Sequence, residues 1–238
     1  MKWQIIDSGD LSPAAIMAKD ADLLSQLTPL SSPILHLYEW DRPCLTYGYF
    51  TCPADYLHLD TLERYGIEAV RRPTGGGIIF HLTDLAFSLL IPVHHPKFSL
   101  NTLDNYAFIN QHVAQIVAHF AVQQKQPELL IKELNCLNSA CQGFCMAKPT
   151  QYDLMREGKK VGGAAQRRTK QGLLHHASLS LTFPPENLLR EVLRNHAQVL
   201  PAMQENSDYL LSSQVTQKEL KEARRAIKQL LMSEIPML

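Results

Sequence analysis

The sequence predicts an α+β fold in which helices flank a mixed, mostly antiparallel sheet. Short apolar or alternating segments follow one another like the strands of hairpins, and longer segments with helical periodicity interrupt them. With 45% hydrophobic and 19% charged residues, the composition is that of an ordinary globular protein. The 238 residues contain no internal repeat, low-complexity tract or clear interdomain linker, so we expect one domain over residues 1–238.

Strands are predicted where apolar residues run together or alternate with polar ones. From Leu85 to Ile91, apolar residues occupy alternate positions, which places their side chains on one face of a strand. The linkers Asp41-Arg42-Pro43 and Glu157-Gly158 predict connections between consecutive strands. The predicted strands are residues 3–6, 34–40, 44–49, 67–71, 78–80, 84–91, 152–156, 160–166 and 173–181.

Helices are predicted where apolar residues recur every three or four positions. The first begins at Pro13, with Ser12 in the capping position, and the second ends at Gly66. Residues 121–150, which hold three of the five cysteines, are polar and weakly patterned and predict a loop region. The helices after the first are expected at residues 55–65, 104–120, 186–194 and 217–232.

Charge, hydropathy and cysteine usage exclude several function classes. Lys+Arg and Asp+Glu number 23 each, which disfavours a general nucleic-acid binder. No apolar run approaches the roughly 18 residues of a membrane helix, and the first residues lack a signal-peptide core, so a cytoplasmic protein is expected. The five widely spaced cysteines fit reduced thiols. Neither Cys141-x3-Cys145 nor His94-His95 has the spacing of a zinc site, so no metal is expected.

The most informative motif is Arg71-Arg72-Pro73-Thr74-Gly75-Gly76-Gly77-Ile78-Ile79-Phe80-His81. Its three consecutive glycines let other atoms approach bare backbone, and two guanidinium groups and an imidazole flank them. Such a turn suits an anion or a thin ligand. A glycine-rich hairpin turn is the plainer interpretation. The spacing of the glycines matches neither a dinucleotide-binding motif nor a P-loop.

Together with three other segments, this motif resembles the lipoate–protein ligases and protein octanoyltransferases, a branch of the biotin/lipoate protein ligase superfamily. The four segments keep the order of that family and are residues 16–24, 40–50, 71–81 and 158–168 with 174–179. Three positions depart from the family pattern. Leu82 stands where the family usually has Asp, with Asp84 two residues further on; Ala177 stands where it has Gly, and Thr51 where it often has Gln.

The resemblance implies acyl transfer to the acceptor lysine of lipoyl domains in 2-oxoacid dehydrogenases, of the H protein of glycine cleavage, or of both. Burying an eight-carbon chain would contribute on the order of 5 kcal/mol. Lys160 resembles the family's essential lysine, whose ammonium can stabilise negative charge on the acyl oxygen. Lys159 is expected on the opposite face of the strand. A solvated hairpin lysine is the alternative for Lys160.

The resemblance also assigns acyl or nucleotide binding. Because the two motifs must meet at one carbonyl, we expect Gly76 and Lys160 side by side on one mixed sheet around one tunnel. Arg71, Arg72, Arg167 and Arg168 could gather around a phosphate or an acidic carrier surface. The assigned residues are Arg71, Arg72, Thr74, Gly75, Gly76, Gly77, His81, Gly162, Gly163, Ala164, Gln166, His176 and Ala177.

The sequence leaves open how the acyl group is activated. A ligase would use lipoate with ATP and Mg²⁺, whereas an octanoyltransferase would take octanoate from an acyl carrier protein. One transferase branch uses a cysteine before Pro-x-x-Tyr-[Asp/Glu]-Leu, and the stretch from Cys145 to Leu154 resembles it. A thiolate is a good nucleophile for thioester exchange, although an inert cysteine is the alternative.

The length of the C-terminal part favours the transferase. Only 57 residues follow Leu181, so we expect C-terminal helices from about residue 184 and no full ligase accessory domain, with no tightly bound cofactor. A non-catalytic relay protein that binds the acyl chain or its carrier is a third possibility. Lys160 and the intact glycine motif disfavour it, because a scaffold needs no such lysine.

Overall fold

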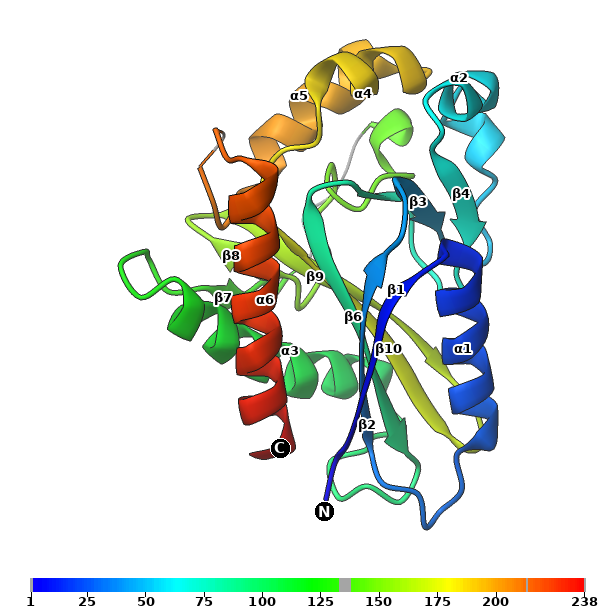
Figure 1. The fold of residues 1–238 in the computed structure, drawn as a ribbon, viewed down its shortest axis with the longest axis vertical. Helices are drawn as coiled ribbons and strands as arrows, with labels where there is room; N and C mark the ends of the chain where they lie inside the picture. The colour runs from blue at the N-terminus through cyan, green and yellow to red at the C-terminus, as the bar shows by residue number, and fades with distance from the viewer. Residues whose placement is uncertain (1, 133–137, 213, 238) are drawn as a thin grey trace.

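The computed structural model describes residues 2–132, 138–212 and 214–237, in which helices pack against two β-sheets (Figure 1). The large sheet has the strand order β1 (Gln4–Leu11), β2 (Ile34–Trp40), β6 (Asp84–Pro92), β10 (Gly172–Ser180), β9 (Lys159–Arg168), β8 (Leu154–Arg156), β7 (Glu128–Leu129). The small sheet has the order β4 (Glu68–Arg71), β3 (Cys44–Tyr47), β5 (Ile79–His81). Among the described strands of the large sheet, β1 and β2 run parallel and the other neighbours are antiparallel. The predicted α+β class is therefore confirmed.

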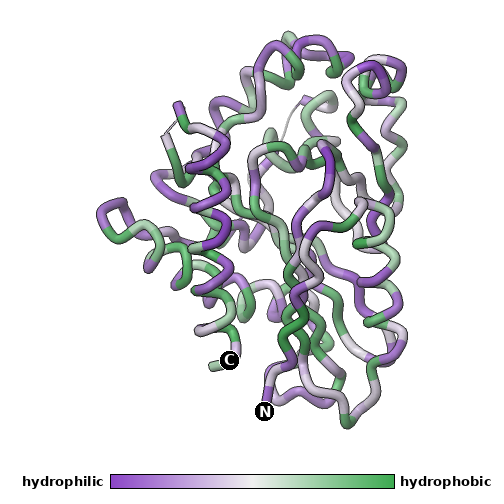
Figure 2. Tube along the Cα trace, in the orientation of Figure 1, coloured by the Kyte–Doolittle hydropathy of each residue, from purple (hydrophilic) through white to green (hydrophobic). Residues whose placement is uncertain are grey.

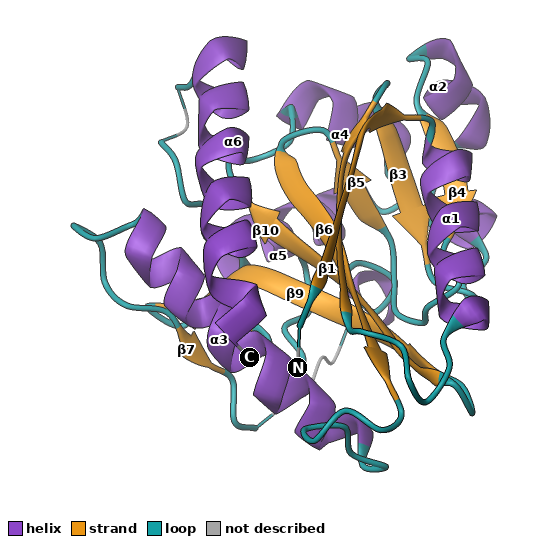
Figure 3. Ribbon diagram, turned by 60° about the horizontal axis from the view of Figure 1, so that its bottom comes forward, coloured by secondary structure: helices purple, strands orange, loops and turns teal. Residues whose placement is uncertain are grey.

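The helices are distributed over both faces of the large sheet. They are α1 (Pro13–Gln26), α2 (Leu59–Arg64), α3 (Thr102–Phe120), α4 (Glu186–Val192), α5 (His196–Asn206) and α6 (Gln217–Glu234), with short 3-10 helices at Pro53–Asp55, Ser139–Cys141 and Ile235–Met237. Helices α3 and α6 cover one face, and α1 and the small sheet lie on the other (Figures 1 and 3). No described helix combines the length and apolar character needed to cross a membrane.

The main hydrophobic core lies between the large sheet and helices α3 and α6. Phe87 and Leu89 of β6 are fully buried there, together with Ile109 of α3 and Ile227 of α6. This is the face that the alternation in residues 84–91 predicts. Hydrophobic residues accordingly concentrate on the central strands, and hydrophilic ones on the outer parts of the helices (Figure 2). The core leaves the opposite face of β6 and β10 available for polar side chains.

Local signals fix several element ends. The Ser12 side chain accepts a hydrogen bond from the backbone of Ala15 at the start of α1, as the sequence predicts. Glu157 and Gly158 both have positive φ, at 52° and 77°. Positive φ at both central residues is what a type I′ turn requires. The predicted hairpin of β8 and β9 is therefore confirmed.

The expectation of one shared sheet and the alternative of a glycine hairpin turn are both wrong. The glycine motif and Lys160 do not share one sheet, because β4 and β5 belong to the small sheet and β9 to the large one. Strands β4 and β5 also lie on opposite sides of β3, so the glycines do not form a hairpin turn. In the same way, residues 34–40 and 44–47 enter different sheets. Local patterning gives the strands but not their partners, because pairing is set by contacts far apart in sequence.

Other elements were not predicted at all. Helix α5 lies where the sequence analysis gives no element, and it contains Pro201, which disfavours a helix interior. Its buried residues Val199, Leu200 and Met203 pack into a second hydrophobic cluster with the small sheet. The expected loop region contains strand β7 and a 3-10 helix at Ser139–Cys141. Cys136 lies outside the described residues.

Candidate active site

A cavity of about 330 Å³ lies where the two sheets meet. This volume is within the range of roughly 300–1,000 Å³ that is usual for small-molecule sites. Gly76 of the glycine motif, Lys160 of β9 and Cys145 of the preceding loop all line it. The expected shared cavity is thus present, although it lies between two sheets. Other predicted residues in its wall are Arg72, Gly77, His81, Gly163, Ala164, His176 and Ala177.

One part of the cavity wall suits an acyl chain. Met17, Tyr38, Trp40 and Ala86 line it, and they pack together as a small apolar cluster. Burial raises the pKa of the Tyr38 phenol well above its usual value, so this hydroxyl stays neutral. An apolar wall next to cationic groups is the combination that an activated fatty acyl group needs.

Arg72 organises the glycine motif from inside. It is only 5% exposed. Its guanidinium donates to the carbonyl oxygens of Gly75 and Gly77, each at 2.8 Å, and to the carbonyl and hydroxyl oxygens of Thr46. Between them, Gly76 has φ of +87°, a conformation that favours glycine. Arg72 therefore acts first as the internal brace of the motif.

Close backbone contacts bring Cys145 to the glycine motif. The Ile78 amide donates to the Gly143 carbonyl at 2.7 Å, and the Cys145 amide donates to the Ile78 carbonyl at 3.1 Å. A Cβ on Gly77 would lie 2.4 Å from the Gly143 oxygen, so this approach requires glycine. The contacts hold the cysteine against the same segment that Arg72 braces.

Arg72 also faces the cysteine. Burial lowers the pKa of the Arg72 guanidinium, and the neighbouring Cys145 side chain acts in the opposite direction. Tyr106 is a further neighbour, and burial raises the pKa of its phenol to about 12. Cys145 is half-buried and lines the cavity.

Lys160 is a buried cation held by one carboxylate. Its Nζ lies 2.7 Å from Oδ2 of Asp153, and the two residues are 8% and 2% exposed. The same carboxylate oxygen accepts from the amide and hydroxyl of Thr150. Gly163 lets the ammonium lie against bare backbone, because a Cβ there would be 2.6 Å from Nζ. Lys159, as expected, is exposed.

Asp153 is a site residue that the sequence analysis did not single out. Its signal was present, because it is the acidic residue of the Pro-x-x-Tyr-Asp-Leu stretch after Cys145. In the structure, the segment from Cys145 to Leu154 places the Cys145 thiol at the cavity and the Asp153 carboxylate beside Lys160.

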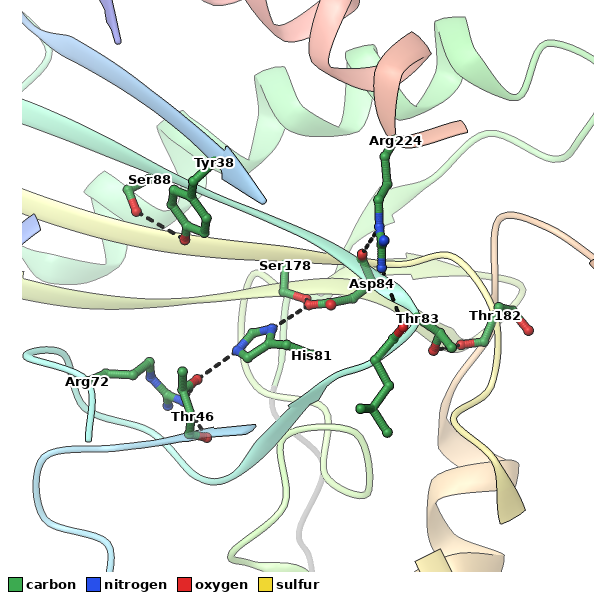
Figure 4. A network of polar contacts seen from close by, with 11 residues as sticks. Tyr38, Thr46, Arg72, His81, Thr83, Asp84, Ser88, Ser178, Thr182 and Arg224 are labelled. Atoms are coloured by element: carbon green, nitrogen blue, oxygen red, sulfur yellow. Dashed lines mark hydrogen bonds and ion pairs between the residues drawn. The ribbon is translucent and has the colours of Figure 1, made fainter. Parts of the chain in front are cut away.

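A first histidine–aspartate pair joins His81, which lines the cavity, to Asp84 (Figure 4). His81 Nδ1 lies 2.7 Å from Asp84, its Nε2 lies 2.8 Å from the Thr46 hydroxyl, and Ser178 donates to Asp84. Burial alone would raise the pKa of Asp84, but the charge and hydrogen bond of His81 outweigh it and lower that pKa. The indole of Trp40 stacks on His81 with centroids 4.4 Å apart. Asp84 thus partners the histidine although it is displaced from the family position.

A second histidine–aspartate pair includes His176, which also lines the cavity. Asp20 of α1 lies 2.9 Å from Nε2 of His176 and 2.7 Å from Nδ1 of His36, and Ser88 donates to it. Burial raises the pKa of Asp20, but the hydrogen bonds of His176 and His36 prevail and lower it to about 2. Nδ1 of His176 lies 3.1 Å from the Thr74 hydroxyl, which links α1 to the glycine motif.

The four arginines do not gather at one anion site, which corrects that expectation. Arg71 lies outside the cavity lining and is exposed over the ring of Tyr49, and Arg72 is the buried brace. Arg167 is exposed near the end of β9, and Arg168 donates to the backbone carbonyl of Leu100. Successive strand residues point to opposite faces, so Arg167 and Arg168 cannot act together.

The remaining assigned residues support the cavity from outside its lining. Gly75 contributes a carbonyl to Arg72, and Gly162 packs against Leu179. Gln166 is hydrogen-bonded to His175 Nδ1, and burial lowers the pKa of that histidine to about 3. Across the described residues, no group of three or more His, Cys, Asp or Glu side chains is arranged to hold a metal ion.

Residues 12–226 match the model of the lipoyl protein ligase A/B catalytic domain. The chain belongs to this family. An octanoyltransferase LipM from Halalkalibacterium halodurans is 30% identical over an alignment of 238 positions, which covers 92% of this chain and 84% of the relative. A lipoate–protein ligase A solved with bound ATP has a TM-score of 0.70 at 22% identity, covering 98% of this chain and 86% of the other.

A further neighbour is a bipartite lipoate protein ligase from Thermoplasma acidophilum, which was analysed with its E2 lipoyl domain. It has a TM-score of 0.63 at 20% identity and covers 98% of this chain and 84% of the other. These two structures share the fold of the chain. The family match, and not these structures, assigns the fold with this cavity to the catalytic domain of lipoyl protein ligases.

Proposed function

We propose that the protein is an octanoyltransferase that modifies lipoyl domains through an octanoyl thioester on Cys145. The observation that carries the proposal is the meeting of three groups in one cavity. Cys145 lies beside the guanidinium of Arg72, and the Lys160 ammonium lines the same cavity. A nucleophile, a cation beside it and a second cation for the acyl oxygen are the parts that acyl transfer requires. The similarity to an octanoyltransferase LipM supports the same reaction.

In the first step, the Cys145 thiolate attacks the carbonyl carbon of an octanoyl thioester on an acyl carrier protein. A new carbon–sulfur bond forms, and Lys160 stabilises the negative charge on the oxygen. The bond to the carrier sulfur then breaks, and the carrier leaves as a thiol with the proton of the cysteine. The octanoyl chain remains along the apolar wall formed by Met17, Tyr38 and Trp40.

In the second step, the neutral amine of the acceptor lysine attacks the Cys145 thioester. An amide forms, the cysteine sulfur leaves, and the proton of the amine passes to that sulfur, so the enzyme is restored. Acceptors of this reaction are lipoyl domains of 2-oxoacid dehydrogenases, the H protein of glycine cleavage, or both. His81 and His176, each held by a buried aspartate, keep the wall around the chain in place.

The deciding experiment incubates the pure protein with an apo lipoyl domain. One reaction receives octanoyl acyl carrier protein, and another receives lipoate with ATP and Mg²⁺. We expect a mass gain of one octanoyl group on the acceptor in the first reaction. Modification only in the second would make the protein a lipoate ligase, and modification in neither would leave a relay protein that binds without catalysis.

A second measurement tests the cysteine. Without acceptor, the octanoyl carrier protein should leave a hydroxylamine-labile octanoyl adduct on Cys145, detected by mass spectrometry. Cys145→Ala should lose the adduct and the transfer. Full activity of this variant would remove Cys145 from the mechanism. That residues 1–238 form one catalytic domain without a full accessory domain stays a prediction.

A further inference from the structure

An exposed aromatic pair and an arginine lie beside the cavity. Tyr49 and Phe50 follow strand β3 and are 47% and 92% exposed. Their rings meet edge to face with centroids 5.1 Å apart, and the Arg71 guanidinium lies 4.9 Å from the centre of the Tyr49 ring. We call Tyr49, Phe50 and Arg71 the aromatic–arginine patch. A phenylalanine this exposed contributes little to the core, and here it stands in contact with a second exposed aromatic ring.

The patch is fixed to the glycine motif. The Tyr49 amide donates to the Thr74 carbonyl and the Thr51 hydroxyl donates to the Gly76 carbonyl, both at 2.9 Å. Thr51, next to Phe50, lines the cavity. These hydrogen bonds fix the backbone that carries the two aromatic residues beside the cavity. Rigid aromatic residues and arginine are the side chains that most often anchor protein interfaces.

The length of a lysine side chain indicates that the acceptor domain, and not the acyl donor, contacts this surface. A lysine presents its amine on a four-carbon stem, roughly 6 Å long, so the acceptor domain must come against the surface around the cavity. The donor needs no such approach, because acyl carrier proteins present the thioester on a long flexible prosthetic arm. The surface that surrounds the cavity is thus the one that the acceptor touches.

The charges on the surface around the cavity also indicate what kind of partner surface it fits. Among the described residues, neither Arg71 nor Arg167 forms an ion pair with a carboxylate. Arg167 lies two residues beyond Ala165, on the face of β9 that carries this cavity-lining residue. An aromatic anchor beside unpaired cations fits a surface with an apolar residue and carboxylates near its lysine.

We propose that the aromatic–arginine patch docks the acceptor lipoyl domain, by contacting an apolar residue and carboxylates that flank the acceptor lysine. The inference rests on the proposed function, and it adds the place where the second substrate binds. Phe50 provides the apolar contact, and Arg71 provides the charge. Loading of Cys145 from the donor does not use the patch.

The test separates the two half-reactions in Phe50→Ser and Arg71→Glu, with Leu30→Ser as matched control. Leu30 is 97% exposed and lies in the loop between α1 and β2. Each variant is first loaded with octanoyl carrier protein, and the adduct on the enzyme is followed by mass spectrometry. The loaded enzyme is then mixed with apo lipoyl domain at limiting concentration, or with a short lysine peptide as an acceptor that has no domain surface.

We expect all variants to load at the wild-type rate and to react equally with the peptide. Transfer to the lipoyl domain should fall at least about tenfold in Phe50→Ser and Arg71→Glu, since loss of an interface anchor commonly costs more than 1.4 kcal/mol. Leu30→Ser should keep the wild-type rate. Transfer by the wild type should slow as salt is added, and less so in Arg71→Glu.

The possible failures are distinguishable. Wild-type transfer by both patch variants, with normal loading, would overturn the docking role and leave the proposed function intact. Slower loading of Cys145 with unchanged transfer to the lipoyl domain would assign the patch to the donor. This result would also overturn the docking role. Equal losses with the peptide would show a disturbed cavity instead of a lost interface. If the wild type itself forms no octanoyl adduct, the proposed function fails first.

Discussion

Replacing Gly163 by alanine tests the position of the Lys160 ammonium rather than its presence. A Cβ at residue 163 would lie 2.6 Å from both Cε and Nζ of Lys160 and 2.7 Å from Oδ1 of Asp153, whereas ordinary contacts are 3.4–4 Å. The lysine end is flexible and would move aside by about 1 Å, and a misplacement of that size costs on the order of 100-fold in rate. We therefore expect Gly163→Ala to fold and to transfer octanoate about 100 times more slowly.

The assay measures formation of the octanoyl adduct on Cys145 and its transfer to a lipoyl domain, with thermal unfolding followed on the same samples. Both half-reactions should slow, because the acyl oxygen carries negative charge in each. Lys160→Ala provides the control background. In a double-mutant cycle, adding Gly163→Ala to Lys160→Ala should have no further effect, since no ammonium remains to be displaced.

Two results would refute this reasoning. A Gly163→Ala enzyme with the wild-type rate would mean that the Lys160 ammonium is not needed at the position that the structure shows. A further loss of rate in the Lys160→Ala background would mean that the new methyl group acts on the substrate or the fold and not on the lysine. Either outcome would contradict the role of Gly163 in positioning the Lys160 ammonium.

The remaining predictions concern Lys160, the buried carboxylate of Asp20 and the close contact between Gly77 and Gly143. Lys160→Ala should slow transfer by a factor of about 100 to 1,000, measured as turnover with octanoyl carrier protein, and unchanged turnover would exclude its role. The pKa of Asp20 is about 2 in the fold against 3.8 in the unfolded chain. About 2 kcal/mol of stability is therefore present above pH 5 and is lost as pH falls toward 2. Asp20→Asn should flatten this acid dependence in denaturant titrations, and an equally steep dependence would contradict the assignment. Gly77→Ala should destabilise the fold by about 1–3 kcal/mol, because its Cβ would meet the Gly143 carbonyl oxygen at 2.4 Å, and an unchanged denaturation midpoint would show that the segments separate easily.

The sequence predicted the parts of the fold that depend on local patterns. Alternation from Leu85 to Ile91 identified the buried face of β6, and Ser12 and Gly158 marked the start of α1 and the turn before β9. Helix α5 was missed because Pro201 speaks against a helix and because its apolar residues pack only in the tertiary structure. The pairing of β4 and β5 with β3 was missed for a related reason, since no local signal states which strands are neighbours.

The sequence predicted the site residues that belong to a recognisable motif. It did not predict the residues whose role depends on what they contact in the fold. Lys160, Cys145 and Gly76 belong to recognisable motifs, and the structure brings all three to one cavity. Asp20 and Asp153 lie inside recognisable segments, but no pattern in those segments states which residue each carboxylate contacts. Their importance arises from burial beside a histidine and a lysine that are distant in sequence or on another strand. Arg72 shows the opposite case, because the motif suggests a ligand-binding cation and the fold uses it as an internal brace.

The brace explains how a loop of bare glycines can position a reactive group. Three glycines in a row would be costly to order if nothing fixed them, because glycine loses more backbone freedom on folding than other residues do. Arg72 binds the carbonyls of Gly75 and Gly77 and so fixes the loop on both sides of Gly76. The ordered loop then offers the Ile78 carbonyl to the amide of Cys145. The guanidinium that orders the loop is also the cation beside the cysteine sulfur. In the proposed mechanism, one buried charge therefore both orders the motif and lies beside the sulfur that attacks the thioester.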